Sequence, residues 1–139
     1  MKLLFNAGSK YFDLGLLIIR LGIGFSYMYN YGFMKISHPD KWAGLGEKMS
    51  MVGIDFAPVF WGFMAAFSEF FGSILLILGL GSRIACFLLG FTMFIAFLTG
   101  FSKNEFNTEA FEMMTVFIGL LFTGPGKYSV DAGLSRKKR

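Results

Sequence analysis

Four long apolar segments account for most of the chain and limit what it can fold into. A helix needs about 20 residues, with a range of about 17–25, to cross the hydrocarbon core of a bilayer. The segments reach this length, and they occupy residues 14–34, 58–80, 84–101 and 106–123. A sheet is excluded, because the backbone groups at its edges would stay unpaired in lipid. The pattern predicts an all-α integral membrane protein with four spans.

The composition agrees with a chain that lipid surrounds. Hydrophobic residues make up 55 % of it and charged residues 16 %, whereas soluble domains carry about 25 % charged residues. The length of 139 residues allows one domain. We therefore expect a single transmembrane domain over residues 1–139.

The connections between the segments predict how the spans are arranged. Gly81, Ser82 and Arg83 form a tight turn that makes the second and third spans antiparallel neighbours. Residues 36–57 form a longer polar loop, a length at which loops are often functional. The fourth span ends at Gly124-Pro125-Gly126, because proline cannot continue a helix. An antiparallel up-down four-helix bundle is the expected architecture, with a short cytoplasmic turn after the second span.

The basic residues predict the orientation of the bundle. Lysine and arginine gather on the cytoplasmic side of membrane proteins. With a cytoplasmic N-terminus, that side holds Lys2, Lys10, Arg83, Lys127, Arg136, Lys137, Lys138 and Arg139, and the other side holds Lys35, Lys41, Lys48 and Lys103. Both termini are therefore placed in the cytoplasm, where the basic tail at 127–139 would contact anionic headgroups. This position explains the positive charge without nucleic-acid binding.

Two charged residues, Arg20 and Glu69, lie inside predicted spans. A charge at this depth costs about 2.5–3.5 kcal/mol, so both must face the interior of the bundle. The helical rise places Arg20 about 9 Å and Glu69 about 16 Å from the cytoplasmic boundary, with Tyr27 at about 19 Å. Tyr27, Tyr31 and Lys35 follow Arg20 on one helical face. The candidate site consists of Arg20, Tyr27, Tyr31 and Glu69.

Two interpretations of Arg20 and Glu69 stay open. They form a buried ion pair that stabilises the bundle, which is the favoured interpretation, or they bind a proton, a quinone-like head group or a polar substrate. Breaking a buried pair costs about 3–5 kcal/mol, so a loss of folding would resemble a loss of function.

The sequence offers little chemistry that the chain could perform alone. Cys86 is the one cysteine and His38 the one histidine. A dithiol couple needs two cysteines, and a structural zinc site needs a cluster of cysteine and histidine. We assign no catalytic residue and no metal ligand, and no cofactor beyond the candidate quinone.

Three segments, taken in order, resemble the DoxX family of small bacterial membrane proteins. They are residues 17–35, which read LIIRLG and end in YGFMK; residues 69–83, which read EFFGSILLILGLGSR; and residues 124–131, which read GPGKYSVD. The resemblance implies a four-helix domain in the bacterial cytoplasmic (inner) membrane. The positions typical of the family are Arg20, Gly32, Lys35, Glu69, Gly72, Gly79, Arg83, Gly124, Pro125, Gly126, Ser129 and Asp131.

Three functional hypotheses follow. The first, which we favour, is a subunit without its own redox centre that supports or anchors a redox enzyme, as the association of the family with sulfur- and quinone-linked redox systems suggests. The second is a binder or carrier of a small lipophilic molecule, such as a quinone, in a pocket near Arg20 and Glu69. The third, ranked last, is an enzyme that uses Glu69 as an acid or base. A redox enzyme and a second copy of the chain are the candidate protein partners.

Overall fold

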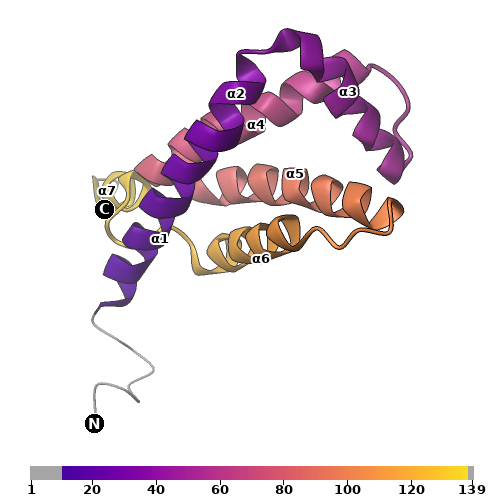
Figure 1. Ribbon diagram of the computed structural model, residues 1–139. Helices are drawn as coiled ribbons and strands as arrows, with labels where there is room; N and C mark the ends of the chain where they lie inside the picture. Colours follow the sequence, from indigo (N-terminus) through magenta and orange to yellow (C-terminus); the bar gives the residue numbers. More distant parts are fainter. Residues whose placement is uncertain (1–10, 138–139) are drawn as a thin grey trace.

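The structure, a computed structural model, describes residues 11–137, and this part of the chain is helical without strands. The long helices are α1 (Phe12–Tyr27), α4 (Pro58–Leu78), α5 (Ser82–Ser102) and α6 (Thr108–Thr123). A π-helical turn, η1 (Met28–Gly32), and the short α2 (Phe33–Ile36) extend α1 into one continuous helix. Packing joins α1 to α4, α4 to α5 and α5 to α6 (Figure 1).

Three helices are long and apolar enough to cross a membrane within the described residues: Phe12–Ile36, Pro58–Leu78 and Ser82–Ser102. The fourth predicted span corresponds to α6, which has 16 residues. At 1.5 Å per residue α6 is about 24 Å long, which is shorter than the hydrocarbon core of about 30 Å. Its start is set by the side chain of Asn107, which accepts a hydrogen bond from the N–H of Ala110 at 3.0 Å. The chain is a helical membrane protein with three clear candidate spans.

The loop predicted at residues 36–57 is largely helical. It contains the 3₁₀ turn η2 (Pro39–Lys41), the short α3 (Trp42–Gly46) and the 3₁₀ helix η3 (Glu47–Val52). We call these three elements the cover segment, because α3 packs against α4 and η3 packs against both α4 and α5 (Figure 1). A Cβ atom added to Gly46 would collide with the carbonyl oxygen of Pro58, and one added to Gly62 with that of Trp42. Two glycines thus allow the backbones of α3 and α4 to touch.

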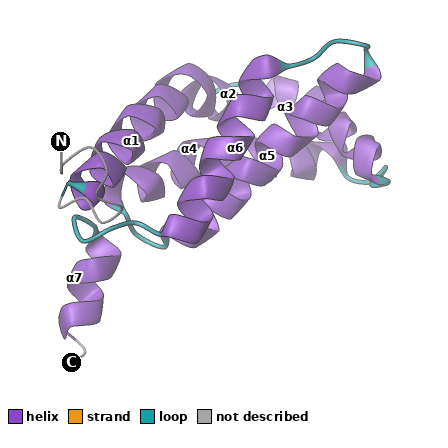
Figure 2. Ribbon diagram, turned by 90° about the horizontal axis from the view of Figure 1, so that it is seen from below, coloured by secondary structure: helices purple, strands orange, loops and turns teal. Residues whose placement is uncertain are grey.

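The basic tail also forms a helix, α7 (Val130–Lys137), which the sequence analysis did not predict. It projects from the end of the molecule at which α1 begins (Figure 2). Lys2 and Lys10, which the predicted orientation uses, lie outside the described residues, as do Lys138 and Arg139.

Candidate functional site

Glycines on the first helix determine which of its residues meet Glu69. A Cβ added to Gly24 would lie 2.5 Å from Cγ1 of Ile77, and one added to Gly32 would lie 2.6 Å from Cα of Phe70. Such contacts let two membrane helices approach closely. Gly32 is therefore level with Phe70 and the neighbouring Glu69 on the antiparallel α4. Lys35 follows Gly32 one turn later along the first helix.

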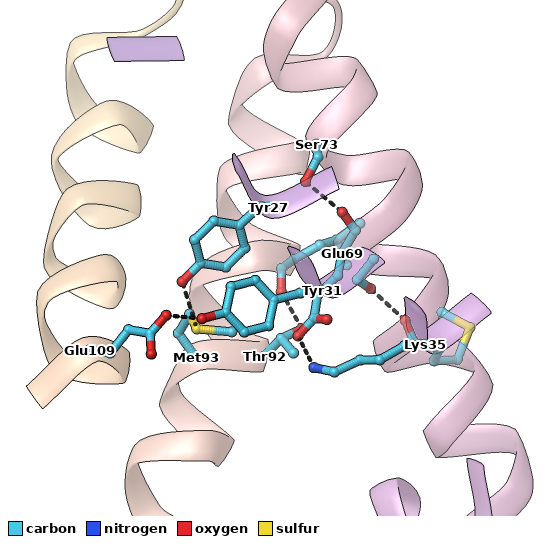
Figure 3. A network of polar contacts seen from close by, with 11 residues as sticks. Tyr27, Tyr31, Lys35, Glu69, Ser73, Thr92, Met93 and Glu109 are labelled. Carbon is cyan, nitrogen blue, oxygen red and sulfur yellow. Dashed lines mark hydrogen bonds and ion pairs between the residues drawn. The ribbon is translucent and has the colours of Figure 1, made fainter. Parts of the chain in front are cut away.

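Lys35 is the partner of Glu69. Its Nζ lies 2.6 Å from Oε1 of Glu69, whose side chain is completely buried (Figure 3). The lysine side chain is 27 % exposed. Long side chains on a helix lean toward its N-terminus, which directs Lys35 back toward Glu69. The second carboxylate oxygen, Oε2, is buried without a hydrogen-bond partner.

The predicted pair of Arg20 and Glu69 does not form in this structure. Arg20 is level with Gly79, where an added Cβ would lie 2.6 Å from Nη1 of the arginine. Glu69 stands ten residues earlier on α4, which corresponds to about 15 Å along the helix. The prediction was wrong because the sequence does not reveal how far one helix is shifted along the other.

Arg20 instead holds the C-terminal part of the chain. Its guanidinium donates hydrogen bonds to the carbonyl oxygens of Pro125 and of Tyr128, the latter at 2.8 Å. The arginine is 1 % exposed. We call residues 124–131 the C-terminal segment. Arg20 therefore contributes to holding this segment against α1 and α4.

Asp131 fastens the other end of the C-terminal segment. Its carboxylate accepts hydrogen bonds from the N–H groups of Gly81 at 2.9 Å and Ser82 at 3.2 Å. It thereby satisfies free N–H groups at the start of α5. The N–H of Asp131 donates to the carbonyl of Gly79 at 3.0 Å. Gly79 adopts a φ of +68°, and a Cβ there would lie 2.5 Å from that of Ser129, so glycine is required at this contact.

Tyr27 and Tyr31 connect the first helix to the helices on its other side. The hydroxyl of Tyr27 donates to Sδ of Met93 on α5 at 3.2 Å. The hydroxyl of Tyr31 donates to Glu109 at the start of α6 (Figure 3). Nζ of Lys35 lies 5.7 Å from the centre of the Tyr31 ring. The two tyrosines therefore lie next to the Lys35–Glu69 pair, but their hydroxyl groups donate hydrogen bonds to other residues.

A pocket of about 250 Å³ lies beside this pair. Lys35 and Glu69 line it together with parts of the cover segment, α4 and α5, but Arg20, Tyr27 and Tyr31 do not. Most of its wall is apolar and includes Met49, Met64, Leu88 and Ile95. Trp61 also lines it, and the N–H of its indole ring is buried without a partner. The space near Glu69 is a mostly apolar pocket with a few polar atoms.

The family is shown by comparison with known protein families. The family model for DoxX matches residues 15–102, which is more than half of the chain. The chain belongs to the DoxX family. Comparison with curated proteins and with solved structures found no match.

The DoxX match contains the Lys35–Glu69 pair and all the residues that line the pocket. It ends before the C-terminal segment, whose contacts with Arg20 and Gly79 come from residues after 102. Two further residues typical of the family have other positions. Gly72 packs α4 against Leu89 of α5, because a Cβ there would lie 3.3 Å from that side chain. Arg83 is exposed at the start of α5.

Sequence analysis of this DoxX chain did not predict most of the residues that line the pocket, among them Lys48, Met49 and Trp61. Lys48 and Met49 belong to the predicted loop, and no periodicity in the sequence indicates that it folds over α4. Lys35 was noted on the same helical face as Arg20, so the signal for a second partner of Glu69 was present in the sequence. Choosing between the two cations required the register of α1 against α4.

Proposed function

We propose that this DoxX membrane protein binds a small lipophilic molecule whose polar head group lies beside Glu69. The observation that carries the proposal is the unpartnered Oε2 of Glu69, which is completely buried at the wall of an apolar pocket. A buried polar atom without a hydrogen bond is costly, by about 1–3 kcal/mol. A guest that supplies a hydrogen bond there, directly or through a bridging water, would remove this cost.

The shape and lining of the pocket support a lipophilic guest. Small-molecule sites are concave and mostly apolar, with a small number of polar groups that orient the ligand. Met49 of the cover segment and Met64 of α4 can adapt to different shapes, because the methionine side chain is unbranched and flexible. The glycine contact between α3 and α4 keeps the cover segment over this space. A quinone is one candidate guest, as the family resemblance suggests.

Native mass spectrometry of the purified chain, released from lipid nanodiscs, tests this proposal. We expect the wild type to retain a small molecule and Ala65→Phe, which places a ring in the pocket, to lose it. Ile118→Phe is the matched control, because Ile118 is exposed on α6. Equal retention by Ala65→Phe and the wild type, or no retention by either, would contradict binding in this pocket.

We further propose that α6 completes a four-helix bundle in the bacterial cytoplasmic membrane, with both termini in the cytoplasm. Support comes from the packing of α6 along α5 and from the basic residues Arg83, Lys127, Arg136 and Lys137 near one end. Reporter fusions at each terminus, one active only in the cytoplasm and one only outside it, distinguish this topology from three spans. An external C-terminus would refute it.

We also propose that the chain supports a membrane redox system by binding a redox enzyme. It rests on the family resemblance and on the basic cytoplasmic surface proposed above. Affinity purification from gently solubilised membranes should enrich a redox enzyme, and repeated recovery of the chain alone would count against the proposal.

A further inference from the structure

The charges around the pocket do not balance. Three charged side chains line it: Lys35, Lys48 and Glu69. Glu69 is already paired with Lys35 at 2.6 Å. Among the described residues, Lys48 has no acidic group within salt-bridge distance. One positive charge at the pocket is therefore left without a counter-ion.

The environment of Lys48 disfavours its positive charge. Lys48 lies in the cover segment and is partly buried. Burial lowers the pKa of its ammonium group, and the positive charges of Lys35 and Lys103 lower it further, while Glu69 acts in the opposite direction. A negatively charged guest would relieve the repulsion and replace part of the lost solvation.

The indole N–H of Trp61 in the pocket wall also favours a guest rich in hydrogen-bond acceptors. The indole N–H of Trp61 is a buried donor without a partner. The ammonium of Lys48 adds three N–H donors. Oε2 of Glu69 is the one unpartnered buried acceptor that lines the pocket among the described residues. The free donors thus outnumber the free acceptor.

We propose that the guest is an anionic amphiphile, with an apolar tail and a carboxylate-type head group that binds Lys48 and the indole N–H of Trp61. The inference rests on the proposed binding function and specifies the class of its ligand. The tail would lie against the apolar wall formed by residues such as Met64, Leu88 and Ile95. The pairing of Glu69 with Lys35 limits its repulsion of the incoming anion.

A neutral head group would use these donors less completely. A carbonyl or ester oxygen can accept the hydrogen bond from Trp61, but it leaves the charge of Lys48 without a counter-ion. An ionised acceptor strengthens the hydrogen bond from the neutral indole N–H and adds a Coulomb attraction to the ammonium of Lys48, and a neutral acceptor does neither. The charge of the head group should therefore control affinity.

Binding of tritium-labelled oleate to the purified full chain tests the inference. Scintillation proximity detects only the oleate bound to immobilised protein. Unlabelled oleate, methyl oleate, oleyl alcohol and a neutral short-tailed quinone are the competitors. We expect the wild type to bind oleate at least about tenfold more tightly than the neutral competitors.

Two lysine variants locate the effect. Lys48→Met should lower the affinity for oleate by about tenfold or more and leave that for oleyl alcohol unchanged. Lys41→Met is the matched control, because Lys41 is exposed on the cover segment and does not line the pocket. Lys48→Arg should retain oleate binding, since the positive charge remains.

The outcomes separate the inference from the function on which it rests. Neutral competitors that displace the labelled oleate as well as unlabelled oleate does, or a Lys48→Met variant that binds oleate like the wild type, would overturn the anionic class and leave the pocket function standing. Failure of every competitor and of oleate to bind would overturn both.

Discussion

The ion pair between Lys35 and Glu69 makes the strongest prediction about stability. Lys35→Met would leave the completely buried carboxylate of Glu69 without its cation, at a cost of about 3–5 kcal/mol in the free energy of unfolding. Glu69→Gln should cost less, about 1–3 kcal/mol, because Lys35 is 27 % exposed and can extend its ammonium group to water. The double variant should be more stable than the sum of the single effects predicts.

A double-mutant cycle measures this coupling. We expect a coupling energy of about 0.5–3 kcal/mol between Lys35 and Glu69, which are in direct contact. Arg20→Gln combined with Glu69→Gln should be additive within about 0.5 kcal/mol, since these residues share no partner. Reversible unfolding in mixed micelles, followed by circular dichroism, gives the free energies. Coupling of Glu69 to Arg20 instead of Lys35 would refute the helix register described above.

Three further predictions concern the cover segment, the C-terminal segment and Lys48. Gly62→Ala should destabilise the fold by about 1–3 kcal/mol, because the added Cβ would collide with the backbone of Trp42. Gly44→Ala is the control and should not destabilise it, because there is open space around Gly44. Thermal unfolding compares the two variants. Asp131→Ala should lower the free energy of unfolding by about 0.5–2 kcal/mol, because α5 loses its cap. The C-terminal segment should also become more sensitive to protease, and equal digestion of the variant and the wild type would contradict this. The pKa of Lys48 is lowered in the folded chain, chiefly by burial. Between this lowered pKa and the ordinary value near 10.5, the unfolded chain therefore binds more protons than the folded chain. The free energy of unfolding should rise with pH across this range. Lys48→Met should lose this rise, and an unchanged pH profile would show that Lys48 is fully solvated.

The resemblance to the DoxX family, inferred from three separate sequence segments, was confirmed by the family match. The helical class follows from the length of the apolar segments alone. Part of the site was also visible in the sequence. Glu69 was recognised because a carboxylate in an apolar segment is costly, so it must face inward. Lys35 and Glu69 were both among the residues typical of the family.

The partner of Glu69 could not be predicted because a helical face repeats every three to four residues. Arg20 and Lys35 share such a face, and both satisfy the pattern equally. The contacts of Gly24 and Gly32 with α4 decide between them. The pocket was not predictable for a related reason, since its cover comes from a segment with no apolar periodicity.

Local physical chemistry thus determined that this chain is helical, that lipid surrounds it and that its mid-span charges face inward, because these properties depend on hydrophobicity and backbone hydrogen bonding along the sequence. Only the tertiary structure decided that Lys35 pairs with Glu69, that Arg20 holds the C-terminal segment and that Lys48 lines a pocket. These pairings depend on how far each helix is displaced along its neighbour, and for the first helix and α4 the close contacts of Gly24 and Gly32 with α4 fix that displacement.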